Sequence, residues 1–210
     1  MSEDRKLSGH TRPYAVLGHP IGHTLSPVMH NASLRALGLD AIYLAFDVAP
    51  DRLMSVLPSM RDMGFGGVNL TVPLKEVAFE GLSLLDDSAK RLGAVNTVEF
   101  LGDGGIRGHN TDGDGFVTAL EELSGQGLEG SHVFVCGSGG AGRAVALTCC
   151  AKGATRVSVT DLDEDRSRKV SAEMQAQFPG VQIDAVPAGE RAWVAASQAA
   201  VESRYHISFG

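Results

Sequence analysis

Short apolar runs alternate with segments of helical periodicity along the first half of the chain. The runs expected to form buried strands are residues 14–18, 41–47 and 68–70. Helices are expected from Ser26 to about Leu37, from Pro50 and from Pro73, because proline is favoured in the first turn of a helix. Pro58 should bend or interrupt the second of these helices. Strands that alternate with helices predict an α/β layer with a mostly parallel sheet.

The pattern restarts after a link that contains glycine and serine at residues 124–131. Before the link, the sequence predicts a β-hairpin from residues 94–100 and 106–109, and then a helix over residues 112–123. After the link come an apolar strand at 132–136, a glycine-rich loop that opens a helix, a strand at 156–160 and a helix at 164–178. The link is therefore a candidate domain boundary.

Composition narrows the classes of function. The 210 residues are 43% hydrophobic and 20% charged, which is ordinary for a globular protein, and the formal net charge of -7 argues against a general nucleic-acid binder. The three cysteines form neither a disulfide framework nor a metal-ligand spacing, so no metal site is expected. No signal-peptide core is present and no run approaches the ~20 apolar residues of a membrane span, so we expect a cytoplasmic protein.

Candidate chemistry begins in the stretch GVNLTVPLK at residues 67–75. Asn69, Thr71 and Lys75 lie among apolar neighbours where a predicted strand gives way to a helix, and a merely solvated turn does not need three such side chains. Lys75 could also be an ordinary surface lysine on a first helical turn. Two later polar stretches favour a site instead, and they are GAVNT at 93–97 and GHNTDG at 108–113.

Hydroxyl groups flank the start of the first predicted helix. Ser26 and Thr24 lie where the helix dipole favours an anion. Ser26 is also explained as a helix N-cap, whereas Thr24 has no such structural explanation. Asp112 is either an N-cap, a functional carboxylate or both, and Asn96 is either a ligand-binding amide or a turn-forming one.

The glycine loop GSGGAGR at residues 137–143 has the context of a dinucleotide site, with a strand before it and a helix after it. Its candidate cofactor-binding residues are Gly137, Gly139, Gly140, Ala141, Gly142 and Arg143. Asp161 follows the next strand, where a carboxylate accepts the ribose hydroxyls of NAD and repels the extra phosphate of NADP. Asp161 could instead be a solvated acid, and the nearby Arg166 and Arg168 leave NADP open.

Taken together, these motifs resemble the shikimate dehydrogenase family, including its quinate/shikimate branch. The matching stretches occur in the family's order and cover about residues 14–186: GHPIGHTLSP at 18–27, VNLTVPLKE at 68–76, GAVNT at 93–97, NTDG at 110–113 and the glycine loop. The resemblance implies a substrate-binding α/β domain over residues 1–113 and a partial NAD(P)-binding Rossmann domain over 114–210.

The resemblance also implies a reaction and a role for each motif. The expected reaction is the reversible NAD(P)-linked reduction of 3-dehydroshikimate to shikimate, or the oxidation of quinate. Lys75 and Asp112 would form the catalytic pair, and an amine and a carboxylate at a hydroxyl group are a reasonable acid/base device. The substrate-binding residues would be Thr24, Ser26, Asn69, Thr71 and Asn96. The oligomeric state stays open, with a homodimer as one option.

Two features depart from the family pattern. Asp161 stands where NADP-using members tend to carry an Asn-Arg-Thr element, which favours NAD. After Ala200 the chain lacks the expected fourth buried strand, a nicotinamide-binding turn and a final helix, so we expect a truncated Rossmann domain with an exposed sheet edge, weak cofactor binding and little turnover.

Two alternatives therefore accompany the dehydrogenase interpretation. A non-catalytic module could bind a shikimate-like acid through the first domain alone. A methylenetetrahydrofolate dehydrogenase shares the general architecture but is disfavoured by Thr24, Ser26 and the NTDG motif.

Overall fold

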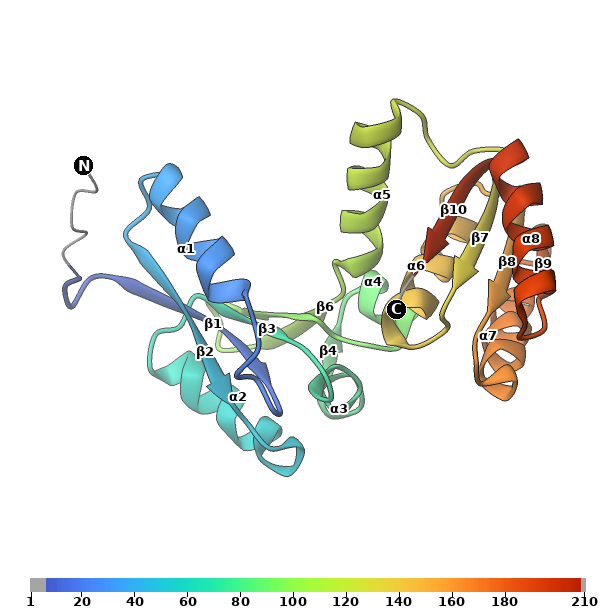
Figure 1. Ribbon diagram of the computed structural model, residues 1–210. Helices are drawn as coiled ribbons and strands as arrows, with labels where there is room; N and C mark the ends of the chain where they lie inside the picture. Colours follow the sequence, from blue (N-terminus) through green and yellow to red (C-terminus); the bar gives the residue numbers. More distant parts are fainter. Residues whose placement is uncertain (1–6, 209–210) are drawn as a thin grey trace. The chain divides into compact units, whose positions relative to one another are not determined.

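The computed structural model describes residues 7–208, and the chain divides into two compact units between Asn110 and Thr111. Figure 1 shows the elements of each unit. The predicted domain boundary at residues 113/114 falls within the first turn of a helix of the second unit. None of the helices in residues 7–208 combines the length and the hydrophobicity needed to cross a membrane.

The N-terminal unit contains a six-stranded sheet in the order β2-β1-β3-β5-β6-β4. Its strands are β1 (Arg12–Gly18), β2 (Ala41–Asp47), β3 (Gly67–Leu70), β4 (Leu84–Leu85), β5 (Thr97–Phe100) and β6 (Ile106–His109). Strand β1 pairs in parallel with β2 and β3, and β5 is antiparallel to both β3 and β6. The predicted hairpin is therefore confirmed, although its first strand begins at Thr97.

Helices cover both faces of this sheet. They are α1 (Ser26–Ala36), the 3-10 turn η1 (Pro50–Arg52), α2 (Leu53–Asp62), α3 (Leu74–Gly81) and α4 (Asp87–Leu92). The larger core joins α2, α3 and α4 to strand residues such as Leu17 and Leu70, and Val16 and Tyr43 pack towards α1 on the other face. Alternate strand side chains thus enter different cores, as the pleat requires. Helix α2 continues through Pro58, so the expected interruption does not occur.

The C-terminal unit contains a parallel four-stranded sheet in the order β10-β7-β8-β9. Its strands are β7 (His132–Cys136), β8 (Arg156–Thr160), β9 (Gln182–Ala185) and β10 (Arg204–Ser208), and its helices are α5 (Asp112–Ser124), α6 (Gly140–Ala151), α7 (Glu164–Gln177) and α8 (Glu190–Ser203). Each parallel connection contains a helix, which is the doubly wound arrangement. The predicted α/β class with a Rossmann-type second half is confirmed.

The expectation that the fourth strand is absent is wrong. Strand β10 runs parallel to β7, with Arg204 opposite His132 and Ser208 opposite Cys136. Strand β10 therefore pairs with the edge of β7 that would otherwise have no neighbouring strand. The chain order reverses between β8, β7 and β10, which places a topological switch point beside β7, where open α/β sheets bind ligands. The stretch escaped prediction because it alternates polar and apolar residues instead of forming a continuous apolar run.

Helix α6 is the packing centre of the C-terminal unit. Residues 144–150 of this helix are all buried, because α6 lies between the sheet and α5. Gly113 is the close-contact point between the two helices, since a Cβ added there would lie 1.9 Å from Thr148 Oγ1. A glycine at position 113 therefore sets how closely α5 approaches α6.

We expect Gly113→Ala to lower the free energy of unfolding by about 1–3 kcal/mol, the usual cost of overpacking a tight contact. The matched control is Gly115→Ala on the same helix, where an added Cβ meets no atom within 4 Å and better helix propensity should stabilise slightly. Urea unfolding of both variants measures the difference, and adding Thr148→Ala should restore part of the loss. Equal stability of the two single variants would contradict this packing.

Candidate functional site

The two polar stretches at 67–75 and 93–97 lie side by side at the end of β3. The amide of Leu70 donates to the carbonyl of Asn96 at 2.8 Å, and the amide of Val95 donates to the carbonyl of Lys75 at 2.9 Å. These bonds extend the pairing of β3 with β5 beyond the strand ends. They bring Asn69, Lys75 and Asn96 to the carboxyl end of β3, where parallel sheets usually hold ligands.

The loop after β1 joins the same end of the sheet. The amide of Thr71 donates to the carbonyl of Leu17 at 2.9 Å, and the amide of His19 donates to the carbonyl of Val72 at 3.2 Å. A Cβ on Gly18 would lie 2.6 Å from Thr71 Cγ2. The absence of a side chain at Gly18 thus permits the close approach of this loop to Thr71.

Hydrogen bonds fix the orientation of the Asn69 amide. Tyr43 donates its hydroxyl to Asn69 Oδ1 at 2.6 Å, and Asn69 Nδ2 donates to the Asn96 carbonyl at 3.3 Å and to Thr97 Oγ1 at 3.1 Å. Burial raises the pKa of Tyr43 to about 12, so its phenol stays a neutral donor at physiological pH. Asn96 itself is only 8% exposed, and its Oδ1 accepts from Thr97.

The hydroxyls at the start of α1 have roles different from those expected. Helix α1 includes Ser26 as its first residue, and no side chain caps it, so the N-cap explanation of Ser26 is wrong. Thr24 has the structural contact instead, because its Oγ1 accepts the amide hydrogen of Ser26 at 3.2 Å and donates to Ser26 Oγ at 3.2 Å. Both hydroxyls nevertheless lie at a helix N-terminus, where an anion is favoured.

The two residues of the predicted catalytic pair lie in different units. Lys75 is in the first turn of α3, and Asp112 is the first residue of α5. Thr111 occupies the N-cap position of α5 and no side chain caps that helix, so the N-cap explanation of Asp112 is also wrong.

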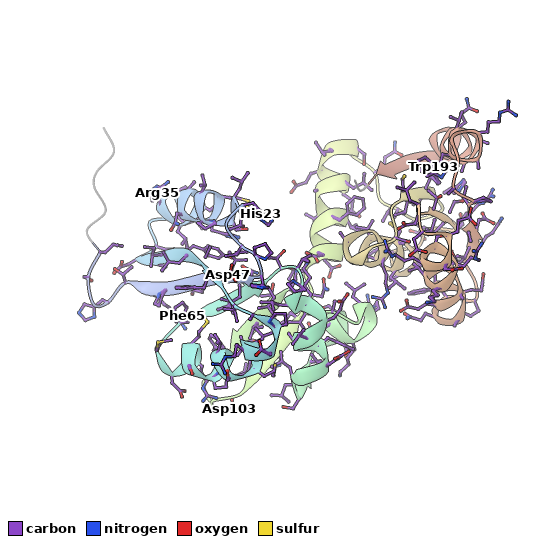
Figure 2. All side chains as sticks on the ribbon, turned by 60° about the horizontal axis from the view of Figure 1, so that its bottom comes forward. His23, Arg35, Asp47, Phe65, Asp103 and Trp193 are labelled. Carbon is purple, nitrogen blue, oxygen red and sulfur yellow. The ribbon has the colours of Figure 1, made fainter. Side chains whose placement is uncertain are left out.

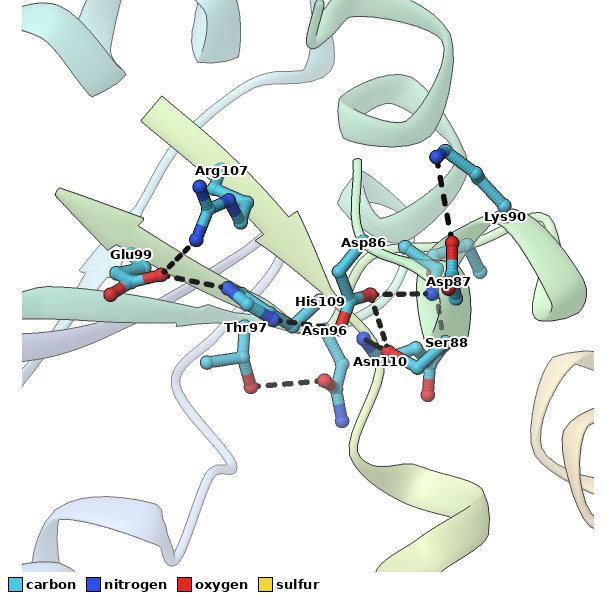
Figure 3. A network of polar contacts seen from close by, with 12 residues as sticks. Asp86, Asp87, Ser88, Lys90, Asn96, Thr97, Glu99, Arg107, His109 and Asn110 are labelled. Carbon is cyan, nitrogen blue, oxygen red and sulfur yellow. Dashed lines mark hydrogen bonds and ion pairs between the residues drawn. The ribbon is translucent and has the colours of Figure 1, made fainter. Parts of the chain in front are cut away.

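A polar network stabilises the end of β6 (Figure 3). The two ring nitrogens of His109 lie 2.9 Å from Asp86 Oδ2 and 3.0 Å from Glu99 Oε2. Asp86 also caps α4 by accepting from the Ala89 amide at 2.9 Å. Partial burial favours the neutral acid, but these hydrogen bonds and the nearby His109 together hold the pKa of Asp86 below its usual value.

The same network reaches the last residue of the N-terminal unit. Ser88 donates its hydroxyl to Asp86 Oδ1 at 2.6 Å and accepts the amide hydrogen of Asn110 at 2.8 Å. Asn110 Nδ2 donates to the Ala94 carbonyl at 3.0 Å. The chain is therefore held at Asn110, two residues before Asp112. Sequence reasoning missed this network, whose members come from α4, β5, β6 and the segments that connect them.

The glycine loop lines a cavity of about 510 Å³ in the C-terminal unit. Gly137 has a φ of 99°, a conformation that favours glycine, and α6 begins at Gly140. A Cβ added to Gly139 or Gly140 meets no atom within 4 Å, so the space above the loop is open to a ligand. Backbone amides at the start of a helix favour an anion, and the loop therefore fits a diphosphate.

Asp161 faces the same cavity and is tied to the loop. Its Oδ2 accepts from the Ser138 amide at 2.7 Å and from the Ser138 hydroxyl at 2.8 Å, while Oδ1 accepts from the Asp163 amide at 3.0 Å. The side chain is 10% exposed, and although its burial favours the neutral acid, these bonds and Arg166 together lower the pKa of Asp161. Asp161 is thus an ionised acceptor, and Oδ1 retains one lone-pair position for a ligand hydroxyl.

The structure separates Arg143 from the other predicted cofactor-binding residues. Arg143 does not line the cavity, and its guanidinium forms a two-point ion pair with Glu173 of α7, with an Nε to Oε2 distance of 2.8 Å. Arg143 is therefore positioned to hold α6 against α7.

Sequence reasoning missed several residues of these sites. Ser138 and Tyr43 orient Asp161 and Asn69, and the cavity is also lined by Cys136, Leu162 and Trp193. For these residues, the sequence signal that could have indicated a role in the site was the position of Ser138 between two glycines of the loop.

Comparisons with known proteins agree with this geometry. The family described as "Shikimate dehydrogenase substrate binding domain" matches residues 16–98. A curated relative, the shikimate dehydrogenase (NADP(+)) of Methanothermobacter thermautotrophicus, is 41% identical over 168 residues, which are 80% of this chain and 58% of the relative. The chain thus spans less than two thirds of that relative's length.

Two solved structures have the same fold. Shikimate 5-dehydrogenase from Thermus thermophilus, in complex with NADP(H) and shikimate, matches with a TM-score of 0.75 and 36% identity, over 95% of this chain and 68% of that one. Shikimate 5-dehydrogenase from Listeria monocytogenes, in complex with shikimate and NAD, matches with a TM-score of 0.79 and 33% identity, over 87% of this chain and 63% of that one.

Proposed function

Because the chain belongs to the shikimate dehydrogenase family, we propose that it catalyses the reversible NAD(P)-linked oxidation of shikimate to 3-dehydroshikimate, with quinate as the alternative substrate. The observation that carries this proposal is the meeting of the two polar stretches of the N-terminal unit at the carboxyl end of β3, where the Asn96 carbonyl accepts from Leu70 and Asn69. The relatives in complex with shikimate support the choice of acid.

The N-terminal unit supplies groups that match a polyhydroxylated carboxylic acid. Thr24 and Ser26 would hold the carboxylate at the N-terminus of α1, which explains how an acidic protein binds an anion locally. Asn69, Thr71 and Asn96 would bind ring hydroxyls, and the fixed orientation of the Asn69 amide favours one pose of the ring.

The proposed catalytic residues would remove the proton of the hydroxyl group that is oxidised. A bound nicotinamide cofactor would supply the hydride acceptor. Lys75 and Asp112 would hydrogen-bond the reacting hydroxyl, and removing its proton lets the carbonyl form as hydride leaves carbon.

The cofactor would be a nicotinamide dinucleotide, with NAD preferred. The open glycine loop fits the diphosphate, and Asp161 fits the adenosine ribose through the unused position of Oδ1. An ionised carboxylate repels a 2′-phosphate, which disfavours NADP. Arg166 lines the cavity, and its Nη1 lies 3.6 Å from Asp161 Oδ2. Its positive charge would partly offset the repulsion between Asp161 and the 2′-phosphate, so NADP would still bind, but with lower affinity than NAD.

We expect Lys75→Ala to lower kcat for shikimate oxidation by about a hundredfold or more, because general acid/base groups contribute on the order of 10²–10⁴-fold. The measurement is NAD(P)H formation, with the shikimate Kd followed by calorimetry. The matched control is Lys90→Ala, since Lys90 is 62% exposed and pairs with Asp87 at 3.6 Å. A Lys75→Ala variant with wild-type kcat would overturn the role. Shikimate binding without turnover in the unmodified protein would favour the non-catalytic module.

We expect Arg166→Ala to lower kcat/KM for NADP by about tenfold, because charge-assisted hydrogen bonds contribute roughly 1.5–3 kcal/mol, and to leave kcat/KM for NAD near its starting value. Arg168→Ala is the control, because Arg168 lies on the same helix but pairs with Glu164 and Asp165. Steady-state kinetics with both cofactors decide the matter. Parallel losses for NAD and NADP would show that Arg166 does not discriminate between them.

A further inference from the structure

The cavity of the C-terminal unit has a second wall that the proposed diphosphate and ribose contacts leave unused. The glycine loop forms one side, and Leu162, Arg166 and Trp193 line the cavity together with Asp161. Trp193 comes from α8, far along the chain from the loop, and is labelled in Figure 2. Trp193 therefore reaches the cavity from a helix that is distant in sequence from the glycine loop.

A hydrogen bond fixes the indole of Trp193 to the end of β8. Its Nε1 donates to Thr160 Oγ1 at 2.7 Å, and Thr160 is fully buried. Thr160 directly precedes Asp161, so the indole is attached beside the proposed ribose acceptor. Because the indole N–H is already bonded to the protein, the ring offers its carbon surface to a ligand, and purine bases bind such surfaces by stacking.

The residues that line the cavity fit one class of ligand. A dinucleotide whose diphosphate lies at the glycine loop and whose adenosine ribose lies at Asp161 carries its purine on the far side of the ribose. Leu162 follows Asp161 in the chain and is 84% exposed, so it provides apolar surface at this position. The cavity therefore places an aromatic and an aliphatic side chain near the acid that the ribose would contact.

We propose that Trp193 forms the purine-binding wall of this cavity, with Leu162 as its apolar neighbour. The inference rests on the proposed binding of a dinucleotide, and it adds the residue that recognises the base. A purely structural Trp193 would only pack α8 against the sheet, which predicts lower stability on truncation but no selective loss of purine affinity.

Trp193 is the single tryptophan of the chain, so its fluorescence reports this site alone. Titration with AMP should change the emission saturably, whereas nicotinamide mononucleotide, which carries no purine, should not. By calorimetry, Trp193→Ala should weaken AMP binding about fivefold or more, because stacking contributes roughly 1–3 kcal/mol per base. Trp193→Phe should lose less, and the shikimate Kd should not change in either variant.

The control variant is Val194→Ala, which alters the next residue of α8, 49% exposed and outside the cavity lining. Thermal unfolding of each variant separates lost stability from lost affinity. An unchanged AMP Kd in Trp193→Ala, or no AMP binding by the unmodified protein, would overturn the inference. Purine binding that depends on Trp193 without shikimate oxidation would overturn the proposed activity alone.

Discussion

The N-terminal site depends on the hydrogen bonds that the Asn96 carbonyl accepts. It accepts from the Leu70 amide at 2.8 Å and from Asn69 Nδ2 at 3.3 Å, and so joins the end of β3 to the segment before β5. The Tyr43 hydroxyl completes the arrangement from β2. Because these groups are largely buried, removing one partner would leave the others without a hydrogen bond, and this would lower the free energy of unfolding. The polar groups proposed to bind the acid are thus held by the sheet itself.

The C-terminal site depends on an equivalent constraint. Ser138 uses both its amide and its hydroxyl to hold one oxygen of Asp161, which ties the glycine loop to the end of β8. Helix N-termini and backbone amides supply local positive potential without basic side chains, so the negative net charge of the chain is compatible with the anionic ligands proposed for both sites. The net charge of the chain therefore says little about its small-molecule ligands.

Local patterns predicted much of the fold, because each of them is decided within a few residues. The apolar run before Gly137, the glycine loop and the helix after it needed no distant partner to be recognised. By contrast, β10 forms through pairing with β7, more than sixty residues away, and its alternating composition gave no signal. Helix α4 depends on the cap from Asp86, and its short sequence carries no clear apolar period.

The site residues also divide into those that a local motif contains and those that depend on distant partners. Lys75, Asp112 and the glycines could be proposed as site residues because each lies in a motif of a few residues. Tyr43, Ser138 and Trp193 act through partners more than twenty residues away in the chain, so no local pattern contains them. The sequence predicted that Ser26 caps α1, whereas Thr24 makes the hydrogen bond to the backbone there. A capping pattern thus locates the start of a helix but does not decide which side chain makes that bond.

The most direct test of the central claim is a titration with shikimate followed by backbone amide NMR. The account predicts that signals from residues 18–27, 67–75 and 93–97 shift together with one saturation curve, while those of the hairpin turn around Gly104 stay unchanged. Shifts confined to one of these stretches, or none at saturating shikimate, would contradict the claim that they form one acid-binding site.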